Sequence, residues 1–80
     1  MMQLTSSQKK HVDSTPPVFR AEMAGFLADC VDVVIHLQDA VPDVGRFAVA
    51  VRDSGFWIDC CDTKEEAALL ATQLGLRVVS

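Results

Sequence analysis

The sequence predicts a small α+β domain whose elements follow the order α-β-β-α-β. Three features of the sequence lead to this prediction. Apolar residues recur with a helical period over residues 18–41, and large and small apolar residues alternate over residues 46–52. Residues 63–66 read Thr-Lys-Glu-Glu, which is typical of a helix N-terminus. We expect a three-stranded, mainly antiparallel sheet with both helices packed on one of its faces.

The chain of 80 residues is long enough for one domain with a small core. Residues 1–15 are mostly polar, with serine, threonine, glutamine and lysine prominent, so we expect a flexible N-terminal tail. Residues 16–80 are then a single folded domain. Pro16 and Pro17 mark the boundary, because proline is tolerated in the first turn of a helix.

Residues 18–41 are expected to form one amphipathic helix that ends before Pro42. Residues 30–37 are rich in β-branched side chains and also alternate in the manner of a strand, so a strand there is an alternative. A helix that breaks near residue 29 is an intermediate alternative. We favour the single helix because the acidic residues keep one helical phase over the whole segment. These acidic residues are Glu22, Asp29, Asp32, Asp39 and Asp43.

A β-hairpin is expected over residues 46–61, with its turn at Gly55. The register of the hairpin has two alternatives. A two-residue turn directs Ile58 toward the core and Trp57 to the opposite face, whereas a bulge at Gly55 reverses this arrangement. We favour the two-residue turn because the bulge would bury Asp59, which is costly for a carboxylate. The two-residue turn also places Cys60 on the core face.

The second helix is expected to start at a capping box formed by Thr63 and Glu66. Gly75 suits the position just after the helix, where a left-handed backbone conformation is common. Residues 76–79 then form a closing strand. We expect this strand to lie antiparallel beside residues 46–52, which would occupy the centre of the sheet.

The charge of the chain restricts the classes of partner. The formal net charge is −4, which argues against direct binding to nucleic acid and favours a protein partner with a basic surface. The acidic helix face, with Glu22, Asp29, Asp32, Asp39 and Asp43, is the candidate contact. We expect no membrane span and a cytoplasmic location, because the sequence has neither a long apolar run nor a recognisable signal peptide.

An alternative contact surface is apolar and aromatic. Its candidate residues are Val31, Ile35, Arg52 and Trp57. A tryptophan beside an arginine is typical of binding hot spots. This surface favours a small homodimeric scaffold or regulatory protein as the alternative function.

Residues that could carry out catalysis are few. Cys60 and Cys61 lack the CxxC spacing of redox and zinc sites, and adjacent strand residues point to opposite faces. His36 lies among acidic residues, which is a pattern more typical of a charged surface than of a general base. We therefore expect no catalytic residue, metal or cofactor. A thiol or metal-dependent enzyme that uses His36 and a cysteine is the third interpretation.

Residues 55–76 read GFWIDCCDTKEEAALLATQLGL and resemble the hairpin-then-helix ending of many small proteins of phages and other mobile elements. The small size, the acidic body and the lack of a catalytic motif are similar to those of anti-CRISPR proteins. The resemblance carries no functional residue across. It implies a stoichiometric inhibitor that acts in the host cytoplasm and binds a nucleic-acid-handling protein complex, such as a CRISPR effector complex.

Overall fold

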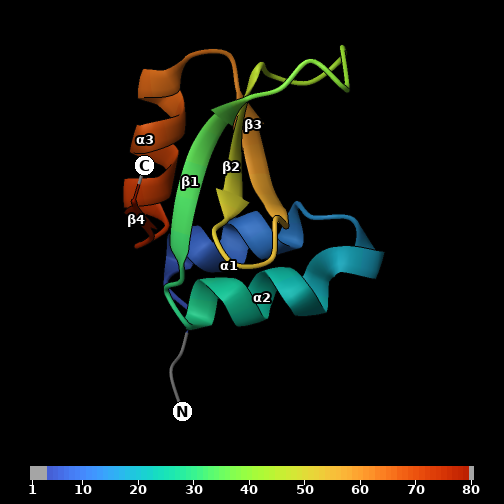
Figure 1. Ribbon diagram of the computed structural model, residues 1–80. Coiled ribbons are helices and arrows are strands. Elements are labelled where there is room, and N and C mark those ends of the chain that lie inside the picture. Colours follow the sequence, from blue (N-terminus) through green and yellow to red (C-terminus); the bar gives the residue numbers. More distant parts are fainter. Residues whose placement is uncertain (1–3, 80) are drawn as a thin grey trace.

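A computed structural model describes residues 4–79 and confirms the α+β class (Figure 1). Its elements are α1 (Ser6–Asp13), the 3-10 helix η1 (Pro17–Phe19), α2 (Arg20–Ala28), β1 (Asp32–Leu37), β2 (Phe47–Val51), β3 (Trp57–Cys61), α3 (Lys64–Gln73) and β4 (Arg77–Val78). None of the helices in this part of the chain is long and apolar enough to cross a lipid bilayer.

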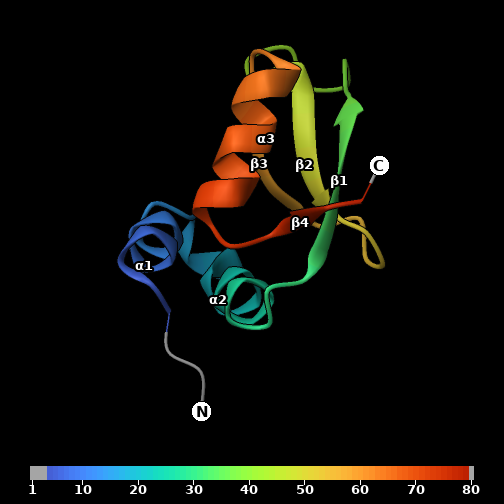
Figure 2. The ribbon, with the colours of Figure 1, turned by 90° about the vertical axis from the view of Figure 1, so that its left-hand side faces the viewer.

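The four strands form one mixed sheet in the order β3-β2-β1-β4. β1 and β2 are antiparallel, as are β2 and β3, whereas β4 runs parallel to β1. Helix α3 covers one face of the sheet, and α1 and α2 pack together at one end of it (Figures 1 and 2). The expected three-stranded sheet is therefore wrong in detail. An additional strand, β1, lies between β2 and the closing strand, so β4 pairs in parallel with β1 and does not pair with β2 as expected.

Residues 18–41 do not form one helix. Helix α2 ends at Ala28, and the chain turns through Cys30, which has a positive φ of 49°. The amides of Cys30 and Val31 donate to the carbonyls of Leu27 and Phe26, the pattern that commonly ends a helix. The structure therefore confirms both alternatives to the single helix: the helix breaks near residue 29, and a strand follows. The β-branched residues that follow pair with β2 along their whole length.

The polar N-terminal segment is part of the folded body. We expected residues 1–15 to be a flexible tail, but residues 6–13 form α1, with Gln8 buried. Residues 1–3 lie outside the described part of the chain. Thr5 and Gln8 form a complete capping box, in which each side chain binds the backbone amide of the other residue.

The hydrophobic core lies between the sheet and the three helices. Valines on the α3 face of the sheet pack against small residues of α3, because Ala67 and Ala71 let the helix backbone approach closely. Helix α2 contributes Met23 and Leu27 to the core from the end of the sheet at which α1 and α2 pack. The buried members are Met23, Leu27, Val33, Val49, Val51, Ile58, Ala67, Ala71, Leu74 and Leu76.

The hairpin combines features of both predicted registers. Trp57 pairs with Ala50 on the face away from α3, and Ile58 is buried in the core, as the favoured register predicts. The pairing then shifts by one residue, which is typical of a β-bulge. Because of this shift, Cys60 lies on the face away from α3 and not on the core face that the favoured register predicts. Asp59 pairs with the core residue Val49 but stays exposed, since β3 is at the edge of the sheet.

The C-terminal end of α3 follows the sequence prediction, whereas at its N-terminus only half of the expected capping box forms. The Thr63 hydroxyl accepts a hydrogen bond from the Glu66 amide at 3.1 Å and donates to the Glu66 carboxylate at 3.2 Å. At the other end Gly75 has a positive φ of 74°, and Leu76 donates its amide to the carbonyl of Ala71.

Candidate functional site

The sheet has one face that no described helix covers (Figures 1 and 2). Paired residues of neighbouring strands point to the same face, so the strand register identifies the side chains there. We call this surface the open sheet face. It consists of Val34, His36, Ala48, Ala50, Trp57 and Cys60. All six side chains are uncharged when histidine is neutral, so this face contributes nothing to the net charge of −4.

Two rings lie over the small central residues of the open sheet face. The ring centroids of His36 and Trp57 are 5.9 Å apart with an interplanar angle of 64°. Beneath them Ala48 and Ala50 are 0% and 2% exposed, although no described helix covers this face. The rings and their neighbours therefore shield the alanines, and a partner at this face would contact the rings first.

The loop between β1 and β2 is held by one buried side chain. The Gln38 amide nitrogen donates to the carbonyls of Val41 and Gly45, and its oxygen accepts from the amide of Val41 at 3.0 Å. Residues 39–44, which we call the acidic loop, project beyond this anchor. They display two exposed aspartates, Asp39 and Asp43, with Val41 and Val44 43% and 42% exposed.

The base of the acidic loop contacts the last residue of β3, directly before the connection to α3. A side chain at Gly45 would overlap the backbone of Cys61, so the two segments pack without any space between them. Figures 1 and 2 show both segments at the same end of the sheet. Five exposed carboxylates and two exposed basic residues gather at this end, which we call the acidic end. They are Asp39, Asp43, Asp62, Glu65, Glu66, Arg46 and Lys64.

The acidic end accounts for most of the charge of the protein. Five acids and two bases give −3 of the net charge of −4. None of these seven residues takes part in an ion pair within residues 4–79, where the one ion pair joins Arg77 to Asp32 at 3.0 Å. The carboxylates of the acidic end are therefore free to attract a basic surface.

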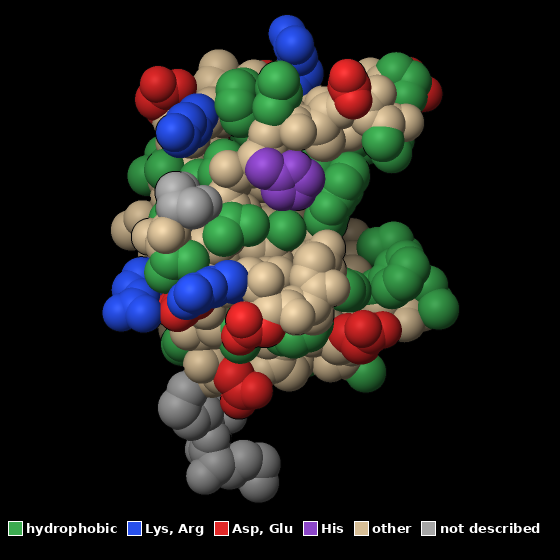
Figure 3. Space-filling view, viewed as in Figure 1, with side chains coloured by type: hydrophobic (Ala, Val, Ile, Leu, Met, Phe, Trp, Pro, Cys, Tyr) green, Lys and Arg blue, Asp and Glu red, His purple; other side chains and the backbone are tan. Residues whose placement is uncertain are grey.

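A hollow separates the acidic loop from the opposite end of the molecule. Figure 3 shows this indentation between the acidic loop and the start of α2, with apolar side chains on both sides of it. At the start of α2, the short helix η1 exposes two apolar residues, Val18 and Phe19, which are 75% and 46% exposed. One side of the molecule is thus concave.

The predicted acidic helix face does not form. Glu22 lies in α2 and Asp29 follows its last residue, while Asp32 is in β1 and binds Arg77. Only Asp39 and Asp43 are brought together, in the acidic loop. Three carboxylates of the acidic end were not among the predicted residues: Asp62, Glu65 and Glu66. The acidic run at residues 62–66 could have identified these three carboxylates, but from the sequence we interpret this run only as a helix cap.

The predicted apolar contact residues do not share one surface. Val31 and Ile35 pack against the core cluster, whereas Trp57 lies on the opposite face of the sheet. Arg52 is exposed in the turn after β2. Only Trp57 therefore stays in a position to anchor a contact on the open sheet face.

The thiols of the hairpin are poor nucleophiles at neutral pH. Burial raises the pKa of Cys60 and of Cys61, and the nearby carboxylate of Asp59 raises both further. The described residues contain no group of three or more His, Cys, Asp and Glu side chains that could hold a metal ion. His36 contacts the Trp57 ring, and its Nδ1 lies 3.4 Å from the carbonyl of Leu37.

Comparisons of this chain with protein-family models, with curated proteins and with solved structures find no significant match.

Proposed function

We propose that this protein is a non-catalytic module that binds another protein through its acidic end. The observation that carries the proposal is the acidic loop, which the buried amide of Gln38 holds in place while Val41 and Val44 stay exposed. A loop that is already ordered loses little conformational entropy when a partner binds. Its exposed valines supply apolar area for the contact, and the surrounding carboxylates supply charge.

The charge around the loop indicates the chemistry of the partner. A surface with a local charge of −3 attracts lysine and arginine side chains and steers a basic protein toward it. Proteins use lysine- and arginine-rich surfaces to neutralise nucleic acid phosphates. The partner that we propose is therefore a protein that handles nucleic acid, with a CRISPR effector complex as one example. By occupying its basic surface, the module would exclude the nucleic acid and act as an inhibitor.

The test compares two double variants that each remove two carboxylates. Asp39→Asn with Asp43→Asn changes the acidic loop, and Glu22→Gln with Asp29→Asn makes the same change of charge on α2 and just after it. Tagged wild type and both variants would be exposed to host lysate at low and moderate salt. Retained proteins would be identified by mass spectrometry, and their affinity measured by calorimetry after purification.

We expect the acidic-loop variant to bind a basic partner about tenfold more weakly than wild type and with a shallower dependence on salt. The α2 variant should bind like wild type, because its carboxylates lie outside the acidic end. Equal affinities for all three forms would refute the proposal. Loss of binding by the α2 variant alone would move the contact to α2.

A homodimeric scaffold is a second candidate, and the open sheet face favours it. Two copies would meet no charge repulsion on this uncharged face, and Trp57 is the residue type that most often anchors an interface. Equilibrium sedimentation of wild type and of Trp57→Lys tests this candidate, with Leu69→Lys on the exposed surface of α3 as control. A dimer that only Trp57→Lys dissociates would support it, and a monomeric wild type would eliminate it.

A further inference from the structure

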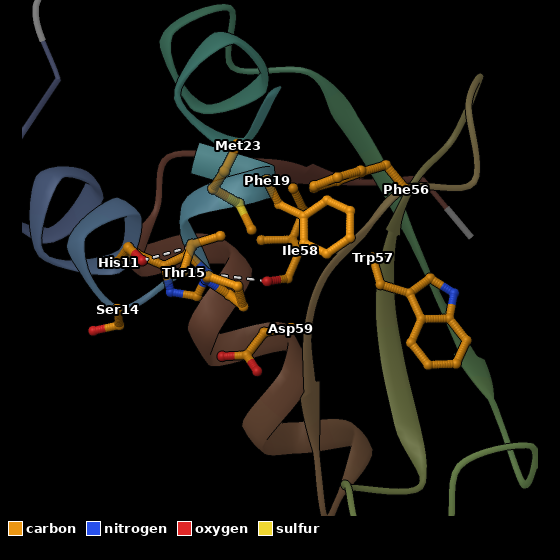
Figure 4. Close-up of a pocket in the computed structure, with 10 residues that line it drawn as sticks. His11, Ser14, Thr15, Phe19, Met23, Phe56, Trp57, Ile58 and Asp59 are labelled. Atoms are coloured by element: carbon orange, nitrogen blue, oxygen red, sulfur yellow. Dashed lines mark hydrogen bonds between the residues drawn. The ribbon is translucent and has the colours of Figure 1, made fainter. Parts of the chain in front are cut away.

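A pocket of about 560 Å³ lies between β3 and the segment formed by α1 and η1 (Figure 4). This volume is within the range of roughly 300–1,000 Å³ that is typical of ligand sites. Buried Met23 and Ile58 form its apolar inner wall. The rings of Phe19 and Phe56 lie beside them, with centroids 6.1 Å apart and an interplanar angle of 70°. A ligand in this pocket would therefore contact apolar and aromatic surfaces.

The histidine and hydroxyl side chains that line the pocket have already used their hydrogen-bond donors. His11 Nε2 lies 3.0 Å from the carbonyl oxygen of Ile58, and since a carbonyl only accepts, this nitrogen carries the proton. The Ser14 hydroxyl donates to the carbonyl of Lys10 at 3.1 Å, and the Thr15 hydroxyl donates to the carbonyl of His11 at 2.9 Å. The indole of Trp57 points away from the other labelled residues in Figure 4.

Acceptors, in contrast, remain available in the same pocket. The Oδ1 atom of Asp59 accepts from the Cys60 amide at 2.7 Å, which leaves its second carboxylate oxygen free. The hydroxyl oxygens of Ser14 and Thr15 keep acceptor capacity, as does Nδ1 of a neutral His11 ring. Asp59 supplies the one formal charge among the residues that line the pocket. A complementary group would have several donors, a positive charge and no acceptor.

We infer that this pocket receives an arginine side chain of the protein partner. A guanidinium has five donors and no acceptor, and its rigid planar fork can donate to several acceptors at once, which an ammonium does less well. The methylene stem would lie on Met23 and Phe19, with the charged head near Asp59. The inference rests on the proposed function for the source of the arginine, while the preference for a guanidinium is independent of the acidic loop.

The direct test uses small probes and the full chain. N-acetyl-arginine methylamide would be titrated into ¹⁵N-labelled protein, in parallel with the citrulline analogue, in which a carbonyl oxygen replaces one nitrogen and the charge is lost. We expect the arginine probe to shift the amide signals around the pocket with a dissociation constant on the order of 1 mM, a weak affinity typical of a small ligand. The citrulline analogue should bind at least about tenfold more weakly. Equal affinities, or shifts centred outside the pocket, would overturn the inference.

A matched pair of variants assigns the charge. Asp59→Asn keeps the oxygen that accepts from the Cys60 amide but removes the negative charge, and Asp53→Asn removes a carboxylate from the exposed turn between β2 and β3. We expect Asp59→Asn to weaken binding of the arginine probe about tenfold, since a charged hydrogen bond is lost, and Asp53→Asn to leave it unchanged. An unchanged affinity for Asp59→Asn would refute the role of this carboxylate.

The two proposals fail in distinguishable ways. Probe binding without capture of a basic partner would support the arginine pocket and count against the proposed function. Capture of a partner whose affinity Asp59→Asn does not change would support the proposed function and place the arginine elsewhere.

Discussion

The side-chain amide of Gln8 donates a hydrogen bond to the carbonyl oxygen of Leu74 at 2.7 Å, although the two residues are 66 positions apart. The same nitrogen donates to the carbonyl of Leu27 at 3.1 Å. Leu27 and Leu74 lie at the C-terminal ends of α2 and α3, where backbone carbonyls lack partners within the helix. One buried glutamine thus satisfies the ends of two helices and joins α1 to both.

Replacing this glutamine should destabilise the whole domain. Gln8→Leu keeps a side chain of similar size but removes the hydrogen bond to the Leu74 carbonyl and leaves the Leu27 carbonyl with the Cys30 amide as its partner. One buried carbonyl without a partner should cost about 1 to 3 kcal/mol of unfolding free energy. Gln73→Leu on the exposed end of α3 is the control, and its effect should stay within about 0.5 kcal/mol. Urea unfolding followed by circular dichroism measures both. Similar losses for the two variants would contradict the role that we give to Gln8.

The backbone at the end of α2 predicts a stabilising substitution. Cys30 has a positive φ of 49°, a conformation that costs a residue with a Cβ atom about 1 kcal/mol. Cys30→Gly should therefore raise the unfolding free energy by about 1 kcal/mol, whereas Cys30→Ala should not, because alanine keeps the Cβ. Thermal unfolding separates the two, with an expected rise of roughly 4–8 °C for the glycine variant. A similar gain in both variants would show that the thiol of Cys30, and not its backbone conformation, lowers the unfolding free energy of the wild type.

The anchor of the acidic loop predicts a local effect on dynamics. Gln38→Glu keeps an oxygen that can accept from the Val41 amide but loses both donated bonds, and it places a carboxylate beside the carbonyls of Val41 and Gly45. We expect the loop to open more often, so that hydrogen exchange at Val41 becomes at least about tenfold faster, as a loss of about 1.4 kcal/mol in local stability requires. Amides in the centre of β2 serve as the internal reference. Unchanged exchange at Val41 would mean that the loop is ordered by other contacts.

The raised pKa values of the hairpin thiols predict the order of their modification. Cys30 is exposed, whereas burial and the carboxylate of Asp59 raise the pKa of both Cys60 and Cys61 above the usual value of 9.0. The thiolate attacks iodoacetamide and displaces iodide, so at pH 8 the reagent should modify Cys30 first, and the rates at Cys60 and Cys61 should keep rising above pH 9. Peptide mapping by mass spectrometry follows each site.

Asp59→Asn should accelerate modification of both hairpin thiols, because removal of a nearby negative charge favours the thiolate. Asp53→Asn in the turn should leave the rates as they are. If Asp59→Asn has no effect, burial alone controls the reactivity of these thiols.

The turns and helix ends of the C-terminal half could be predicted from the sequence because their signals are local, whereas the pairing of β4 with β1 could not. The turn at Gly55, the Thr63 cap and the left-handed Gly75 each depend on a few neighbouring residues. The bulge that moves Cys60 to the open sheet face was missed, since it depends on how β3 fits against β2. A pattern within one strand contains no information on that fit.

The N-terminal half depends on distant contacts and was predicted less well. The acidic side chains between residues 22 and 43 are spaced as on a helix. The β-branched residues of β1 nevertheless form a strand, because they gain partners in β2 and β4. The capping box of Thr5 and Gln8 was visible in the sequence, yet the burial of Gln8 comes from helix ends far along the chain. The acidic end could not be predicted for the same reason, because the fold brings its two segments together.

The position of β4 has a consequence for biosynthesis. β1 pairs with β4 only after the chain has passed through β2, β3 and α3, and Arg77 and Asp32, which bind each other, are 45 positions apart. Until residues 74–78 have left the ribosome, the outer edge of β1 lacks its neighbour and Gln8 lacks one of its two acceptors. Contacts of such long separation form late in folding. We therefore expect the nascent chain to expose an unpaired strand edge to chaperones until β4 has emerged.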